Sequence, residues 1–105
     1  MKTLTIKVTT EQASRYIRTA NRAETLVADG YTFDEIGAEM VAVTKPGKLA
    51  ASYFINLHTA ECDCPDFTGN GSFCKHLIAY AAIQEEARMW EAICKEAEFR
   101  ASEEN

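Results

Sequence analysis

No run of apolar residues approaches the roughly 18 that a membrane-spanning helix needs, so we expect no membrane segment. The first ten residues alternate apolar and polar side chains, whereas a secretory signal peptide needs a continuous apolar stretch there. The chain also lacks a Gly-rich phosphate-binding loop, a Ser/His/Asp set and paired carboxylates at a recognisable spacing. We therefore expect a cytoplasmic protein that is not an enzyme.

A surplus of basic residues, which is usual in a dedicated nucleic-acid binder, is missing as well. The formal net charge is −5, and it is unevenly distributed. Residues 1–60 carry seven Lys/Arg and six Asp/Glu, whereas residues 61–105 carry four and ten. Any contact with DNA phosphates is therefore expected from the N-terminal half, together with one lysine of the C-terminal half. The candidates are Arg15, Arg18, Arg22, Lys45, Lys48 and Lys75. The three arginines are spaced so that they share one exposed face of a helix. The alternative is that this face is solvated and contacts no phosphate.

The length of 105 residues, with 47% hydrophobic and 26% charged residues, predicts a single globular domain over residues 1–105. Period-two alternation predicts strands at 4–8, 39–44 and 49–58, the last with its odd-numbered residues in the core. Helices are expected from about residue 10 to Gly30 and from residue 75 to about 99, while residues 31–38 fit either a helical turn or a loop. The fold class is α+β: an N-terminal strand and helix, an antiparallel β-hairpin, a metal-binding loop and a long C-terminal helix.

The C-terminal helix carries apolar residues at steps of three and four. They are Tyr80, Ile83, Ala87, Trp90, Cys94 and Ala97. We expect Trp90 and Cys94 to be buried in the core. This helix is also acidic, so an exposed part of the stripe suits a protein partner or self-association into a homo-oligomer.

Three cysteines and a histidine carry the chemical signal: Cys62, Cys64, Cys74 and His76. Residues i and i+2 of an extended strand end point the same way, so Cys62 and Cys64 can reach one ion. Cys74 is expected just before the C-terminal helix and His76 in its first turn. Three thiolates and an imidazole suit one structural zinc ion per chain. Two disulfides, a redox pair at Cys62 and Cys64, and an iron–sulfur centre stay open as alternatives.

Cys-x-Cys, a short loop and Cys-x-His resemble the SWIM-type zinc finger family. Tyr53-Phe-Ile-Asn-Leu57, Cys64-Pro-Asp-Phe67 and Cys74-Lys-His-Leu-Ile-Ala79 resemble its local patterns, so the resemblance covers about residues 39–83. It implies zinc on the four residues within a ββα arrangement, and binding to DNA or to protein. Members are usually parts of larger chains such as transposases and helicase-like ATPases, which suggests a DNA-processing assembly.

The main alternative function is an iron–sulfur protein for electron transfer. The CDGSH-type iron–sulfur proteins share the first part of the spacing, but they need three residues between the last cysteine and the histidine. Here only Lys75 lies between. We also expect Phe67 and Phe73 to pack over the thiolates, and His58 to be solvated.

Overall fold

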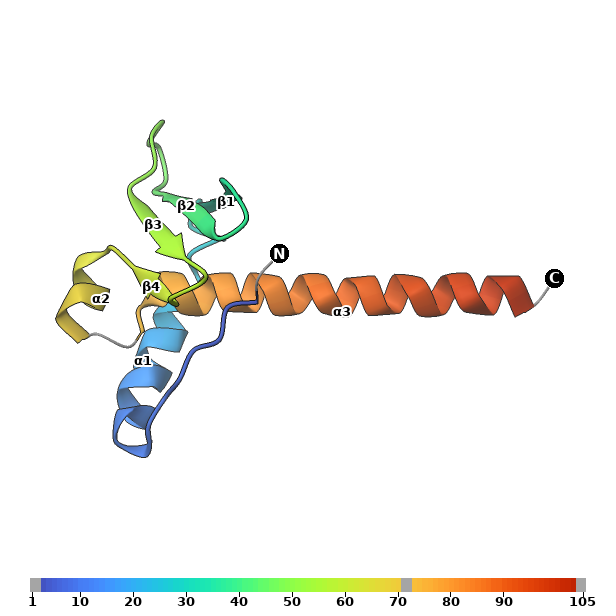
Figure 1. Cartoon of the computed structure of the whole chain (residues 1–105), viewed down its shortest axis with the longest axis horizontal. Helices are drawn as coiled ribbons and strands as arrows, with labels where there is room; N and C mark the ends of the chain where they lie inside the picture. Colours follow the sequence, from blue (N-terminus) through green and yellow to red (C-terminus); the bar gives the residue numbers. More distant parts are fainter. Residues whose placement is uncertain (1–2, 71–72, 104–105) are drawn as a thin grey trace.

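A computed structural model describes the backbone of residues 3–70 and 73–103 and the side chains of residues 3–68 and 73–96. Four strands form one antiparallel sheet in the order β1-β2-β3-β4, and the helices pack beside it (Figure 1). The elements are η1 (Thr10–Gln12, a 3-10 turn), α1 (Ala13–Ala23), β1 (Thr32–Glu35), β2 (Met40–Thr44), β3 (Tyr53–Asn56), β4 (Glu61–Cys62), α2 (Pro65–Asn70) and α3 (Lys75–Glu103). The predicted α+β class is confirmed.

The predicted hairpin is present and supplies the centre of the core. Val41 of β2 faces Ile55 of β3, and both side chains are fully buried. The turn between the strands contains Gly47 at φ +74°, a conformation that glycine adopts without strain. One side of the sheet packs on the first turns of α3, where Leu77 is fully buried and Tyr80 is 3% exposed.

Three predictions about strands need correction. Residues 3–9 form no strand, because they do not pair with the sheet: the segment begins beside α3, where the Leu4 N–H donates to Gln84 Oε1 at 2.9 Å, and then leads away from α3 to the start of α1 (Figure 1). Residues 32–35, expected as a loop or helical turn, form β1 because they pair with β2. The strand predicted over 49–58 shrinks to β3, and Leu49 is fully exposed, although Ile55 and Leu57 are buried as predicted.

The first helix begins where the sequence predicts and loses its regular form early. The Thr9 N–H donates to Gln12 Oε1 at 3.1 Å, which caps the first turn. Regular helix ends at Ala23, and turns continue to Gly30 at φ +103°. A Cβ at Gly30 would lie 3.3 Å from Pro46 Cβ, so this glycine also allows close approach to the β2–β3 turn.

The predicted burial of the second half of α3 is wrong. Trp90 is 60% exposed and Cys94 is exposed, because this part of the helix extends beyond the sheet and α1 (Figure 1). The side chain of Ala97 lies outside the described residues. Within the described residues, none of the helices combines the length and apolarity needed to cross a bilayer.

Candidate metal centre

The four predicted ligands come together in one buried cluster between the sheet and α3. Cys62 ends β4, Cys64 precedes α2, Cys74 precedes α3, and His76 lies in the first turn of α3. Their ligand atoms all lie within 4.8 Å of one another, and each residue is at most 3% exposed. The structure therefore brings together the four residues that the sequence singled out.

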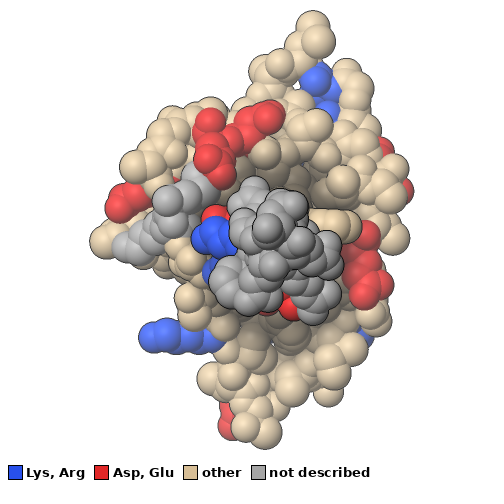
Figure 2. Space-filling model, turned by 90° about the vertical axis from the view of Figure 1, so that its right-hand side faces the viewer, with Lys and Arg blue, Asp and Glu red and all other residues tan. Residues whose placement is uncertain are grey.

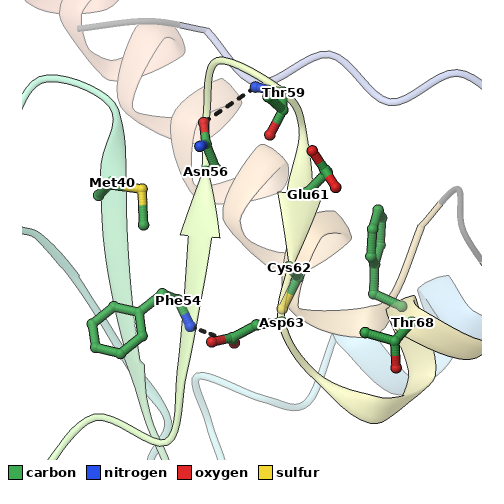
Figure 3. Close-up of a pocket in the computed structure, with 9 residues that line it drawn as sticks. Met40, Phe54, Asn56, Thr59, Glu61, Cys62, Asp63 and Thr68 are labelled. Atoms are coloured by element: carbon green, nitrogen blue, oxygen red, sulfur yellow. Dashed lines mark hydrogen bonds between the residues drawn. The ribbon is translucent and has the colours of Figure 1, made fainter.

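Pairing between β3 and β4 turns the first two cysteines inward. Phe54 and Asp63 exchange two hydrogen bonds: the Phe54 N–H donates to Asp63 Oδ1 at 2.8 Å, and the Asp63 N–H donates to the Phe54 carbonyl at 3.2 Å (Figure 3). These two hydrogen bonds hold the Asp63 side chain on the side of the strand away from the core. Because successive side chains of an extended segment alternate, its neighbours Cys62 and Cys64 both face the core.

Cys64 is held at the start of a short helix that the sequence analysis missed. The Phe67 N–H donates to Cys64 Sγ at 3.4 Å, and the Thr68 N–H donates to the Cys64 carbonyl at 3.1 Å. Pro65 in the first helical position, followed by Asp66, is the signal that could have found α2. The predicted fold has only a metal-binding loop at this point.

The histidine presents Nδ1 to the sulfur atoms. His76 Nδ1 lies 3.9 Å from Cys62 Sγ and 3.8 Å from Cys74 Sγ. His76 Nε2 is buried and has no hydrogen-bond partner among the described residues. The ring lies beside Tyr53 and Tyr31, at centroid distances of 4.9 and 5.9 Å. The sequence placed Tyr53 on the core side of the strand that leads to the first cysteine, but gave neither tyrosine a role beside the histidine.

These distances fit a tetrahedral zinc ion. Zn–S and Zn–N bonds of about 2.3 and 2.0 Å give a sulfur-to-nitrogen edge of about 3.5 Å. The two observed edges are within a few tenths of an ångström of that value. With three sulfur atoms and His76 Nδ1 as ligands, the tetrahedron is complete and has no position left for water.

The ionisation of the thiols also fits a cation. Hydrogen bonding from Cys62 lowers the pKa of Cys74 to about 4, with further help from His76 and the Leu77 N–H at the start of α3. The pKa of Cys62 is raised, because it shares its proton with Cys74 and is buried. Burial is also the main cause that raises the pKa of Cys64. One thiolate is thus stabilised by the protein alone, and a cation would stabilise the other two.

Comparison with known families decides the type of site. Residues 53–81 match the family model of the SWIM zinc finger. Comparison with curated proteins and with solved structures found no match. The matched segment contains all four ligands, begins at β3 and ends within α3, so it is shorter than the predicted range of 39–83 and excludes β2. Together with the buried Cys3His cluster, the match supports a zinc-binding module at residues 53–81.

The aromatic residues of the SWIM finger have different roles. Phe67 packs with the cysteines in the main core, as predicted. Phe73 does not: it packs on α1, with the Tyr16 ring 5.4 Å away and the Arg15 guanidinium 4.8 Å from its centroid. His58 lies outside the cluster, 3.7 Å from Glu39, with a side chain that is 61% exposed.

The candidate phosphate contacts do not form one surface. Arg18 and Arg22 are exposed on α1, whereas Arg15 is partly buried against Phe73. Lys45 and Lys48 lie in the β2–β3 turn, at the opposite end of the molecule from the start of α1 (Figure 1). Lys75 begins α3 and is partly buried. On the face shown in Figure 2, basic side chains appear as separate spots among acidic ones.

A pocket of about 610 Å³ lies on the outer side of the SWIM finger (Figure 3). Strands β2, β3 and β4 and helix α2 line it, and its lining includes Met40, Phe54, Phe67, Glu61 and Asp63. Asp63 is already bonded to the Phe54 backbone. The pocket therefore combines apolar side chains with exposed carboxylates beside the buried metal cluster.

Proposed function

We propose that this chain is a non-enzymatic interaction module of the cytoplasm, held together by one structural zinc ion, and that its partner is a protein. The observation that supports it best is the closed Cys3His cluster. A catalytic zinc site keeps one coordination position open for water or substrate. Four buried ligand atoms within 4.8 Å of one another support a site that is filled by the protein.

The position of the cluster supports a structural role for zinc. Cys62, Cys64 and Cys74 belong to the main core cluster together with Ile55 and Leu77. A bound ion would therefore join β4 to the start of α3 in the centre of the domain. Because a structural ion binds only the folded arrangement, its binding free energy would add to folding stability.

The compact cluster also favours zinc over the iron–sulfur alternative. A two-iron cluster divides its four protein ligands between two metal atoms, which spreads the ligand atoms further than a single ion does. Elemental analysis of protein purified without chelator tests this directly. We expect one equivalent of zinc and a colourless sample, whereas iron or a brown colour would overturn the proposal.

A protein partner is supported by the surface. The chain is acidic, and large apolar side chains are exposed on several elements, among them Phe54 at 39% and Val27 at 56%. A partner held by apolar contacts stays bound when salt is raised. The test is capture of partners by the zinc-loaded chain at low and physiological salt, with each candidate then purified and titrated against it. The proposal would be contradicted if none of the purified candidates bound the zinc-loaded chain directly.

DNA binding is the second candidate, and one observation favours it. A hollow of about 530 Å³ on α1 is lined by Arg15, Arg18, Thr19, Asn21 and Arg22. The Nε and Nη2 atoms of Arg15 are buried and have no hydrogen-bond partner among the described residues. A phosphate oxygen would supply the missing acceptor.

Fluorescence anisotropy with duplex and single-stranded oligonucleotides separates the two candidates. The protein-binding proposal predicts little DNA affinity at any salt concentration. DNA binding through this hollow would neutralise at most about three phosphates, giving a salt slope of roughly −2 to −3. It would then be weakened by Arg18→Ala with Arg22→Ala, and unaffected by Lys48→Ala at the distant turn.

A further inference from the structure

One apolar stripe runs along α3 from the packed domain onto its projecting half. Its exposed members are Met89, Trp90 and Ile93, which are 58, 60 and 52% exposed. Going back along the helix by steps of three and four residues, the same face continues through Glu86 to Ala82 and Ala79. Helices in proteins gain most of their stability from packing such a face. Among the residues that the structure describes, nothing covers the apolar side of the projecting half of α3.

The packed end of the same stripe borders a groove between α1 and α3. The groove has a volume of about 390 Å³. Alanines from both helices line much of it: Ala20, Ala23, Ala79 and Ala82, with Val27 and Ile83 beside them. Small side chains leave room for a large one, and Trp90 is the largest exposed apolar residue described in the chain.

We propose that two copies of this chain dimerise through α3, each placing its Trp90 in the α1–α3 groove of the other. The spacing along the helix supports a second copy as the occupant. Ala82 in the groove and Trp90 on the stripe are each four residues from Glu86, in opposite directions. A two-fold axis near Glu86 therefore sets two antiparallel α3 helices side by side with Trp90 opposite Ala82 in both halves.

Such a contact is self-complementary, because each chain supplies both the large side chain and the groove. It covers Met89, Trp90 and Ile93 of both copies at once, together with the exposed Val27 beside the groove. The arrangement places α1 and α3 of each copy in one four-helix assembly. This dimer goes beyond the proposed zinc module and does not depend on the identity of any other partner.

The same geometry brings one unfavourable contact. The two Glu86 carboxylates meet near the axis, and like charges at that separation repel. We therefore expect that replacing Glu86 with an uncharged residue strengthens the dimer. A partner with basic side chains would instead lose affinity on the same change.

Sedimentation velocity of the zinc-loaded full chain over a wide concentration range tests the proposal. We expect the wild type to reach the mass of two chains. Trp90→Glu is expected to raise the dissociation constant at least about 30-fold, as truncating a central tryptophan does at other interfaces. Lys95→Gln is the matched control: it lowers the net charge by the same one unit at an exposed position on the side of α3 away from Met89, Trp90 and Ile93, and should leave the dimer intact.

Glu86→Gln provides the second, independent measurement, with an expected gain of roughly fivefold in affinity. A wild type that stays one chain at every concentration overturns the proposal. So does a Trp90→Glu variant that dimerises normally, a Lys95→Gln variant that is equally disrupted, or a Glu86→Gln variant with unchanged or weaker association. Zinc content and DNA titrations are separate readouts, so failure of the dimer and failure of the zinc module are distinguishable.

Discussion

Replacing one zinc ligand should destabilise the domain far more than replacing the remaining cysteine. Cys64 is 1% exposed within the ligand cluster, whereas Cys94 lies exposed on the projecting half of α3. The two substitutions Cys64→Ser and Cys94→Ser make the same chemical change. Their difference therefore reports on what surrounds each sulfur.

The magnitude follows from the role of the ion. Structural zinc contributes about 10–16 kcal/mol of binding free energy in zinc-finger peptides, whereas a whole domain is stable by only about 5–15 kcal/mol. Loss of even about 3 kcal/mol shifts the midpoint of a 60–100-residue domain by roughly 12–24 °C. We expect the thermal midpoint of Cys64→Ser to fall by at least that much. Cys94→Ser should change the free energy of unfolding by no more than about 0.5 kcal/mol, as surface substitutions do.

Thermal melts followed by circular dichroism check this, at equal zinc and equal protein concentration, because association makes the midpoint depend on concentration. A strong chelator should lower the midpoint of the wild type and of Cys94→Ser toward that of Cys64→Ser, and should change Cys64→Ser little. Similar midpoints for the two variants in zinc would refute the structural-metal reasoning. So would a wild-type melt that the chelator leaves unchanged.

Three further results are expected. Zinc affinity should rise with pH, because the raised pKa values of Cys62 and Cys64 leave protons that the metal must displace, and a competition titration at several pH values would measure this. Asp63→Ala should cost about 1 kcal/mol in chemical denaturation by removing the acceptor of the Phe54 N–H, whereas Asp34→Ala on the exposed side of β1 should cost less. Gly30→Ala should destabilise by about 1 kcal/mol or more, since its φ of +103° and its approach to Pro46 both disfavour a Cβ; no loss in denaturant melts would contradict that.

The ligand set could be predicted because its geometry is local. Spacing by two residues turns Cys62 and Cys64 to one side of an extended segment, and the onset of helical periodicity places His76 in the first turn of α3. The core positions Ile55 and Leu57 follow from the same alternation. None of these inferences needs to know which distant element lies opposite.

Predictions failed where the partner of a segment decides the outcome. Alternation at residues 4–8 correctly predicted that Leu4 is buried, but a strand also needs a neighbouring strand, and this segment leads from α3 to the start of α1 without pairing with the sheet. Residues 32–35 contain a single apolar residue, Phe33, so the sequence shows no alternation there. They form a strand only because β2 pairs with them. The predicted burial of the stripe on α3 fails for the same reason. Periodicity shows that a helix has an apolar face, but it does not show whether another part of the chain covers that face.

The Cys3His cluster and the projecting helix are physically connected through the first turn of α3. Cys74 and His76 stand at the start of that helix, so a metal ion bound there fixes where α3 begins and in which direction it leaves the sheet. α1 packs on the turns of α3 that follow, from Ile78 and Ala79 onward, and Phe73, next to Cys74, packs on α1 through Tyr16 and Arg15. The α1–α3 groove is therefore shaped by residues adjacent to the ligands. A zinc ion that stabilises this finger would at the same time set the geometry of the surface through which we propose that two chains associate.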